Sequence, residues 1–393
     1  MTSWRLFKSW AVVGTALSLI VTLAAGASAQ SASSIRLNFR QLDMLNRTDG
    51  WALSAKGVWR TTDGGKDWVS ASPPGFSYNA VVQSKPYVPQ GGFFALGMAD
   101  AWVLQQAAAP NGDWWKATDR IWRTTDGGRT WKWSLLGKGG SGPTIQFLNR
   151  RDGFVMLVTG AAMGSEGAEV FGTTNGGRTW RLLAQGDPSH GAIPFWGDKL
   201  GMTFINQTVG WITSATNVTT AWAARTTDGG RYWSNQKLEL PPAWRSPSHA
   251  GGAFTYPPQF FGRQTGALAI GNRGLAIYTT HDGGKTWRMK SNAARSPNST
   301  DFTYVQFVNV KTCFVISQEF VPPGAITMRL YETADDGVHW SERKAPPGLT
   351  QVDFVTPEIG WAVADGEGWS ANVWKTKNGG GTWSEVQPRS VSG

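Results

Sequence analysis

Short apolar runs separated by turn residues set the pattern of this chain. A typical unit has an apolar-x-Phe run, a Gly-Trp or equivalent about seven residues later, a further apolar run and then a polar hairpin, as from Phe204 through Trp211 to Trp233. Every run is short and is bounded by Gly, Asn or Asp, which is typical of strands. Each unit therefore predicts the order strand, turn, strand, loop, strand, hairpin, strand.

The hairpin that ends each unit is a repeated motif, Thr-Thr-Asp-Gly-Gly-x-Thr-Trp in its fullest form. Its copies occupy residues 62–68, 125–131, 174–180, 227–233, 281–287, 334–340 and 377–383, and successive tryptophans are 43 to 63 residues apart. The Asp or Asn side chain can bond the backbone two residues on, glycine supplies the positive φ of a tight turn, and tryptophan offers a wedge to bury between sheets. We expect a structural role for these hairpin residues: Asp63, Asp126, Asn175, Asp228, Asp282, Asp335, Asn378, Trp68, Trp131, Trp180, Trp233, Trp287, Trp340 and Trp383.

The repeat length fits one four-stranded sheet per unit. We expect an all-β fold, a seven-bladed β-propeller with four-stranded antiparallel blades, formed by residues 30–393 as one domain. Two segments bear on how the ring closes. Residues 384–387 can serve as the last outer strand. Residues 35–39 form a strand-like segment that either pairs into the seventh blade or lies outside it as an arm.

The hairpins resemble the Asp-box (BNR) repeats of sialidases and sortilin-type propellers. The fuller unit resembles the photosystem II stability/assembly factor family, most clearly from Phe354 to Trp383, and the resemblance covers about residues 35 to 388. It implies a propeller that acts as a binding scaffold in membrane-complex assembly and is not an enzyme. Long inserts depart from a minimal repeat, so the resemblance does not identify the partner; they lie at 71–92, 107–118, 185–200 and 241–257.

The N-terminus has the features of a secretory signal peptide over residues 1–29. Arg5 and Lys8 precede an apolar, uncharged run from residue 10 to residue 25, and Ala27-Ser28-Ala29 is a small-x-small cleavage site. We expect an exported protein that is secreted, periplasmic or associated with the cell wall. The alternative is a retained membrane anchor, for which the run is short. No other stretch is long and apolar enough to cross a bilayer.

Composition and charge narrow the class further. The 49 Gly and 23 Trp suit tight turns and apolar wedges better than helices. The single cysteine, Cys313, excludes an internal disulfide and fits a buried strand position. Net charge is +10, or +8 without Arg5 and Lys8, which favours anionic partners such as acidic glycans, anionic lipids or acidic protein faces, and also fits solubility alone. We expect no nucleic-acid partner, because the sequence has no recognition motif.

Six tryptophans fall in neither the signal, the hairpins nor the strands. In the predicted register their loops share one face of the propeller, and exposed rings beside Asn, Gln and Gly suit sugar or protein surfaces. Packing of the long loops onto the propeller is an equal alternative. The candidate partner-binding residues are these six and two histidines in similar Pro-Ser-His settings: Trp114, Trp115, Trp196, Trp222, Trp244, Trp369, His190 and His249.

The two histidines have acidic residues nearby, Asp187 and Asp198. A metal site needs three or four converging ligands, and the spacing does not provide them, so we expect loop hydrogen bonding, with no metal and no cofactor. Basic residues also recur beside the hairpins, and they form either a solvated rim or an anionic docking surface: Arg60, Arg123, Arg225, Lys66, Arg129, Arg178, Arg231 and Lys285.

A glycoside hydrolase is the competing class. A sialidase-like site needs an arginine cluster, a Tyr–Glu pair and a further acid, but the Arg-Ile-Pro segment is missing and there are only seven Tyr. Such chemistry needs two carboxylates across a pocket, and the loop acids form no recognisable motif. We therefore expect no catalytic residues. The predicted function is a monomeric, non-catalytic exported scaffold for an extracytoplasmic protein or glycan; the alternative is a sialidase-like hydrolase using the loop face.

Overall fold

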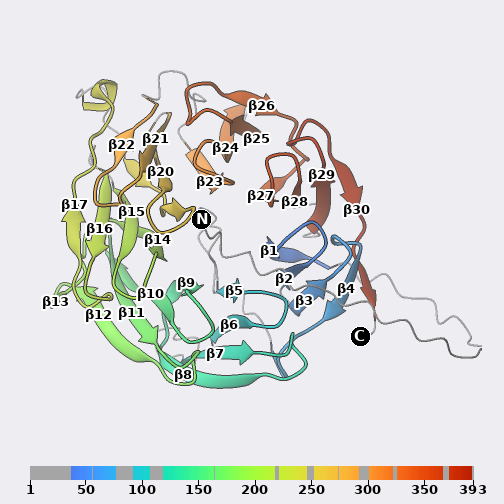
Figure 1. Ribbon diagram of the computed structural model, residues 1–393, viewed down its shortest axis with the longest axis horizontal. Coiled ribbons are helices and arrows are strands. Elements are labelled where there is room, and N and C mark those ends of the chain that lie inside the picture. Colours follow the sequence, from blue (N-terminus) through green and yellow to red (C-terminus); the bar gives the residue numbers. More distant parts are fainter. Residues whose placement is uncertain are drawn as a thin grey trace, which may run out of the picture.

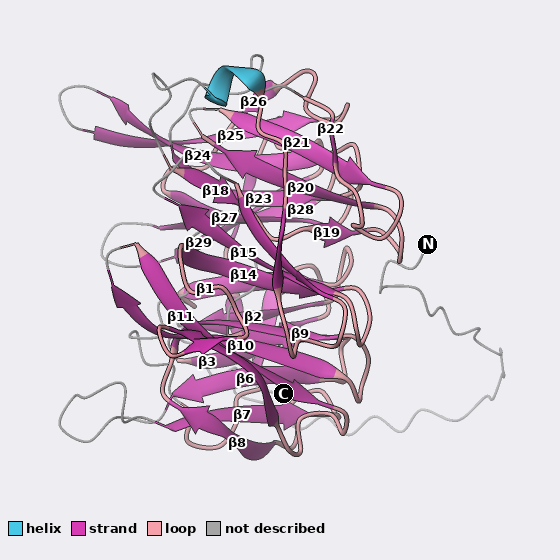
Figure 2. Ribbon diagram, turned by 90° about the vertical axis from the view of Figure 1, so that its left-hand side faces the viewer, coloured by secondary structure: helices cyan, strands magenta, loops and turns pink. Residues whose placement is uncertain are grey.

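The computed structural model describes residues 37–54, 56–76, 92–106, 118–162, 164–216, 221–245, 252–272, 274–291, 301–321, 325–365 and 371–391. The predicted signal peptide, residues 1–29, lies outside these ranges and stays a prediction. The described chain is all-β, apart from one 3₁₀ helix, η3 (Pro242–Arg245), which lies at the periphery (Figure 2). No helix in the described ranges is long and apolar enough to cross a membrane.

The strands form a β-propeller in which sheets are arranged around a common axis (Figure 1). Five sheets are separate blades of four or five strands. Two of these have five strands: the first holds β1 (Phe39–Met44), β2 (Gly50–Ser54), β3 (Gly57–Thr61), β4 (Asp67–Ser70) and β31 (Arg389–Val391); another holds β9 (Ser141–Phe147), β10 (Gly153–Ala162), β11 (Ser165–Thr173), β12 (Arg181–Asp187) and β13 (His190–Gly191).

The other three separate blades have four strands each. They are β5 (Phe93–Ala95), β6 (Ala101–Gln106), β7 (Thr118–Thr124) and β8 (Lys132–Lys138); β23 (Asp301–Phe307), β24 (Cys313–Val321), β25 (Ala325–Thr333) and β26 (Ser341–Arg343); and β27 (Leu349–Phe354), β28 (Gly360–Asp365), β29 (Ala371–Thr376) and β30 (Ser384–Val386). The sixth sheet has nine strands: β14 (Asp198–Phe204), β15 (Gly210–Thr216), β16 (Trp222–Thr226), β17 (Ser234–Gln236), β18 (Ala253–Thr255), β19 (Gln259–Phe260), β20 (Gly266–Gly271), β21 (Leu275–Thr280) and β22 (Arg288–Met289).

The prediction of seven four-stranded blades is wrong, because the described strands give five separate blades and one nine-stranded sheet. The cause is β18, which comes from the predicted insert at 241–257. It pairs with β15, where Ala215 faces Phe254, and with β20, where Phe254 faces Gly271. The strands of the fourth and fifth repeats are therefore hydrogen-bonded into one sheet. The all-β class and the propeller arrangement are confirmed.

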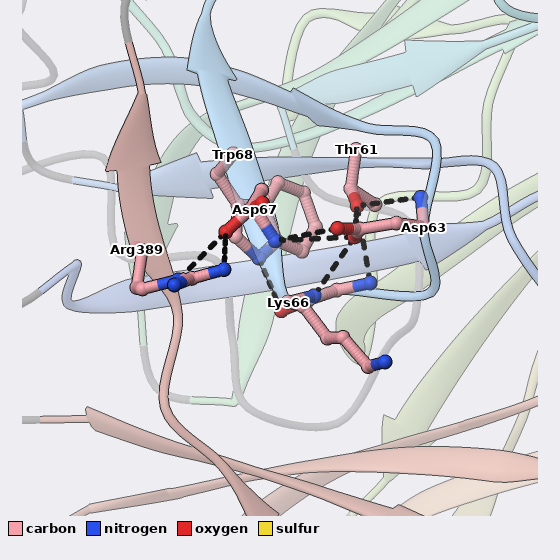
Figure 3. Close-up of polar contacts among 7 residues, drawn as sticks. Thr61, Asp63, Lys66, Asp67, Trp68 and Arg389 are labelled. Atoms are coloured by element: carbon pink, nitrogen blue, oxygen red, sulfur yellow. Dashed lines mark hydrogen bonds and ion pairs between the residues drawn. The ribbon is translucent and has the colours of Figure 1, made fainter.

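Ring closure also differs from both predicted alternatives. In the described part of this segment, Leu37 and Phe39 are buried, and Phe39 starts β1, which pairs with β2 of the first sheet instead of joining the last blade or lying outside as an arm. Instead, β31 pairs in parallel with β4, and Arg389 donates to Asp67 over 2.8 Å (Figure 3). The prediction that residues near 384 form the outer strand of the last blade is confirmed by β30.

The hairpins share one hydrogen-bond pattern, drawn for the first copy in Figure 3. Thr61 donates its hydroxyl to Asp63 over 2.9 Å and accepts the Gly65 N–H over 3.0 Å. Asp63 also accepts the Lys66 N–H over 3.0 Å. The threonine–acid or threonine–amide contact recurs in all seven copies, at 2.8 to 3.0 Å. These bonds satisfy backbone N–H groups of a turn in which two consecutive glycines have positive φ.

The sixth hairpin lacks the first glycine and shows why the motif tolerates this change. Asp336 has φ of 62° and is followed by Gly337. Asp is among the few non-glycine residues that adopt this region readily. Thr333 still bonds Asp335 over 3.0 Å and Gly337 over 2.9 Å. The decayed sequence therefore keeps the same turn.

Glutamine side chains on inner strands join neighbouring sheets. Gln146 donates to the Phe204 carbonyl over 3.0 Å and accepts the Phe204 N–H over 2.7 Å. Gln306 bonds Phe354 in the same two-way manner. The contact at the ring closure is made by Gln351, which bonds both the N–H and the carbonyl of Leu42, at 3.0 and 2.9 Å. A primary amide suits this role because it carries a donor and an acceptor side by side.

Candidate functional site

A groove lies at one end of the nine-stranded sheet, where β16 begins and β17 ends. The register places these ends together, because Ser214 pairs with Trp222 and Ala223 pairs with Gln236. The segment before β14 and the segment after β17 meet at this end. They enclose a groove of about 480 Å³, whose lining includes Trp196, Trp222, Asn235, Lys237, Leu238 and Leu240. A volume of several hundred Å³ is typical of ligand clefts.

Two tryptophans form one wall of the groove. The rings of Trp196 and Trp222 pack edge to face, with centroids 6.2 Å apart and planes at 72°. Trp222 is 2% exposed and Trp196 is 39% exposed, so the second ring keeps open surface while the first supports it. The backbone N–H of Trp222 donates to the hydroxyl of Thr255 on the bridging strand β18, over 3.2 Å. The pair is therefore built on the sheet itself.

A buried lysine fixes the loop that carries Trp196. The ammonium of Lys199 donates to the carbonyls of Phe195, Trp196 and Gly197, at 3.1, 3.2 and 3.0 Å. An ammonium has three donors, and each meets a carbonyl here. The same nitrogen lies 5.0 Å from the centroid of the Trp222 ring, within cation–π range. Lys199 thus orders both the backbone beneath Trp196 and the ring beside it.

The neighbouring β9–β13 sheet also holds this loop. Glu166 of β11 accepts the Lys199 N–H over 2.7 Å, and its own N–H donates to the Gly197 carbonyl over 3.2 Å. The Gly197 N–H donates in turn to the Gly164 carbonyl over 3.1 Å. The loop is therefore fixed at the junction of two sheets, and Trp196 is presented from a rigid base.

The opposite wall is the extended segment from Asn235 to Leu240. It leaves the sheet after β17 and crosses to the β20–β22 strands, where the Tyr278 hydroxyl donates to the Glu239 carbonyl over 2.5 Å. Leu238 and Leu240 are buried against these strands, whereas Lys237 and Glu239 are exposed. This alternation gives the wall an apolar inner side and a polar outer side.

A second, smaller cleft continues along β17. It measures about 220 Å³ and shares Asn235 and Gln236 with the groove. Arg225 lines it, with its guanidinium carbon 5.7 Å from the centroid of the Trp211 ring. Burial lowers the pKa of Arg225. Tyr232 is exposed at the same cleft, so polar and aromatic groups extend along the strand from the groove.

The structure brings only some of the predicted site residues together. Trp196 and Trp222 share the groove, as described. Trp222 starts strand β16 and so does not lie in a loop as expected. Of the two alternatives for the loop rings, packing applies to Trp244, which is 2% exposed in η3 and packs with the Leu238 and Tyr278 side chains. The remaining tryptophans and one histidine lie outside the described residues: Trp114, Trp115, Trp369 and His249.

His190 lies apart from the groove lining, in the short strand β13. Its Nδ1 is 2.9 Å from a carboxylate oxygen of Asp187 three residues earlier, and both backbone and ring bond this acid. This is hydrogen bonding within one loop. Among the described residues, no group of three or more His, Cys, Asp or Glu side chains is placed to hold a metal ion.

Two carboxyl groups have raised pKa values, which bears on the hydrolase alternative. Burial raises the pKa of Asp119 to about 6, while its Oδ2 accepts the Gly140 N–H over 3.0 Å. Burial, and then the nearby Asp187 carboxylate, raise the pKa of Glu169. Neither Asp119 nor Glu169 is in the lining of the groove or the smaller cleft.

Sequence reasoning found the two tryptophans of the groove but missed the polar residues around them. Lys199 and Asn235 lie in strands β14 and β17 of the fourth repeat but stand at no motif position, so no pattern marks them. Gln146 and Gln306, in contrast, stand directly before the phenylalanine of the strand pattern. That recurring Gln-Phe pair could have indicated a role at the inner strands.

No family model matches the sequence, and no curated protein matches it. Among solved structures, the chain is similar to a GH74 xyloglucanase from Xanthomonas campestris, with a TM-score of 0.56 and 12% identity over 90% of this chain and 54% of that one. It thus spans about half the length of the xyloglucanase. It is also similar to YCF48 bound to a D1 peptide, with a TM-score of 0.51 and 14% identity over 87% of this chain and 92% of that one.

A third similar structure is a PL25 ulvan lyase bound to a GlcA-Rha3S saccharide. Its TM-score is 0.51, with 9% identity over 78% of this chain and 84% of the lyase. At such low identities these likenesses show the β-propeller fold alone. They include both a peptide-bound protein and polysaccharide-cleaving enzymes, so the function has to be argued from the site.

Proposed function

We propose that this protein is a non-catalytic, exported binding scaffold that holds a protein or glycan partner in the groove beside Trp196. The observation that carries the proposal is the arrangement of this tryptophan. Its ring keeps 39% of its surface exposed, although three Lys199 hydrogen bonds order its loop and Trp222 supports its edge. An exposed aromatic ring on a pre-ordered base is typical of a binding hot spot.

Similarity to other propellers also supports the scaffold role. YCF48 is similar in fold and was solved with a bound D1 peptide, which makes a protein partner reasonable for this chain. The net charge of +10 favours an anionic surface on such a protein partner. If charge contributes, capture of the partner weakens as salt is raised, because exposed charges are screened.

Co-sedimentation tests the proposal. The purified protein is mixed with envelope proteins and, separately, with insoluble envelope polysaccharide, at low and high salt. Trp196→Ala is compared with Trp133→Ala, a matched control on β8 whose side chain is 49% exposed and lies outside the groove lining. We expect Trp196→Ala to capture the partner at least tenfold more weakly than the parent protein, and Trp133→Ala to capture it as strongly as the parent. Equal capture by both variants and the parent protein would refute the proposal.

A polysaccharide-cleaving enzyme remains the second candidate function. The observation in its favour is the pair of raised carboxyl pKa values, at Asp119 and Glu169, since catalytic acids are tuned in this way. Assays of chromogenic glycosides and of polysaccharide chain scission test it. Turnover that is lost in both Asp119→Asn and Glu169→Gln would favour the enzyme over the scaffold.

A further inference from the structure

We infer that the groove beside Trp196 is a subsite for a neutral saccharide chain, with Trp196 as the stacking platform and Asn235, Lys237 and Glu239 as its hydrogen-bonding rim. This inference rests on the proposed binding function and names the ligand class of that same groove.

The aromatic wall suits a sugar ring. Trp196 offers a flat apolar surface with a polar N–H, and the apolar C–H face of a pyranose packs against such a surface. The ring is held in advance by the edge contact with Trp222 and by the Lys199 bonds to its loop. The Trp196 ring and its loop are thus already ordered before a ligand binds, so the entropic cost of immobilising the side chain is small.

The opposite wall suits hydroxyl groups. Asn235, Lys237 and Glu239 are exposed and alternate along an extended segment, so they point to the same side. Together they offer an amide, an ammonium and a carboxylate, which can donate to or accept from hydroxyls that do both. The neighbouring Gln236 is already engaged, since it accepts from Trp211 and donates to the Gly284 carbonyl.

The charge of the rim favours a neutral ligand. Lys237 and Glu239 carry opposite charges two residues apart. Lys199, the other cation at this site, is buried with its ammonium bonded to three carbonyls. An acidic sugar therefore meets no uncompensated cation in this groove.

The form of the groove favours a saccharide over a peptide. Peptides and helices are commonly anchored by side chains that enter apolar pockets. Here the leucines of the wall, Leu238 and Leu240, are buried against Tyr278 and leave a ring surface as the main apolar feature. A groove of about 480 Å³ matches a short stretch of sugar chain.

Titration with defined oligosaccharides tests the inference. The full chain is titrated with cellohexaose, xylohexaose, mannohexaose and chitohexaose, and with hexagalacturonate as the acidic counterpart, by calorimetry and by tryptophan fluorescence. We expect saturable binding of at least one neutral hexasaccharide and at least tenfold weaker binding of the acidic one. Trp196→Ala should weaken that binding at least tenfold and Asn235→Ala about threefold, whereas Trp133→Ala leaves it unchanged.

Two further measurements separate the possible failures. Trp196→Tyr keeps a ring and should retain more than a third of the affinity, and thermal unfolding confirms that each variant is folded. If no neutral hexasaccharide binds, the saccharide inference is overturned. If envelope protein is still captured in a manner that needs Trp196, the proposed scaffold function stands with a protein ligand. If neither ligand needs Trp196, both fail.

Discussion

The ammonium of Lys199 donates a hydrogen bond to the backbone carbonyl of Trp196 over 3.2 Å, and the same nitrogen lies 5.0 Å from the centroid of the Trp222 ring. One buried cation therefore links the exposed and the buried tryptophan of the groove. The contact explains how a long insert can present an aromatic ring in a fixed position.

Replacing this lysine should disorder the groove and destabilise the protein. Lys199→Met keeps the length of the side chain but removes the ammonium donor from the Phe195 and Trp196 carbonyls, while the Gly197 carbonyl keeps the Glu166 N–H. An unsatisfied buried group costs about 1–3 kcal/mol. We expect a loss of that size in the free energy of unfolding, measured with urea, and a red shift in tryptophan emission. Lys237→Met, at an exposed position, should change stability by less than about 0.5 kcal/mol. Equal effects of the two changes would contradict the role given to Lys199.

The glutamine at the ring closure gives a second prediction. Gln351→Ala removes both bonds to Leu42, whose backbone groups are buried on the inner strand. We expect destabilisation of about 1–3 kcal/mol, since two buried groups lose their partner. The exposed Gln387 provides the control: Gln387→Ala should change the free energy of unfolding by less than about 0.5 kcal/mol. A neutral Gln351→Ala would show that closure does not depend on this amide.

The C-terminal strand gives a third prediction. Deleting residues 389–393 removes β31 from the edge of β4 and leaves the backbone of β4 unpaired on that side. We expect a lower melting temperature and greater aggregation, because exposed strand edges template association. Arg389→Ala alone should cost no more than about 1 kcal/mol, as is usual for exposed ion pairs. A truncated protein with unchanged melting and solubility would contradict the role of β31.

Asp119 gives a pH dependence with a definite sign. Its pKa is about 6 in the folded protein and near 3.8 when exposed, so the folded state holds the proton more tightly. This group therefore lowers stability as pH rises from about 4 to 6, by an amount on the order of 3 kcal/mol. Asp119→Asn removes that loss.

Urea unfolding of the parent and the Asp119→Asn variant at pH 4 and pH 7 checks this prediction. The free energy of unfolding of the variant minus that of the parent should be larger at pH 7 than at pH 4. Comparing the two proteins at each pH cancels the contribution of the other acids. A difference that does not change between pH 4 and pH 7 would show that Asp119 does not titrate in this range.

The hairpins were predictable because their chemistry is local. Asp63 accepts from residues within four positions, and the paired glycines directly indicate a turn with positive φ. The strands that flank the hairpins follow from the same pattern. The propeller could thus be predicted from residues that are close in sequence.

The number of blades and the groove could not be predicted in this way. The bridging strand β18 is three residues long, and its pairing with β15 and β20 depends on where an insert returns to the sheet. Lys199 acts through Glu166, 33 positions earlier, and through a ring 23 positions later. Trp244 resembles an exposed loop residue in sequence but is buried by strands of the next repeat.

Oxidative footprinting tests the central claim, that partner binding occurs at Trp196, without any substitution. Trp196 and Trp133 are both well exposed in the free protein, at 39% and 49%, so both indoles should be modified by hydroxyl radicals and quantified by mass spectrometry. With a saturating partner or oligosaccharide, we predict at least fivefold protection of Trp196 and unchanged modification of Trp133. Modification of Trp196 at the same rate in the free and bound protein would contradict the account.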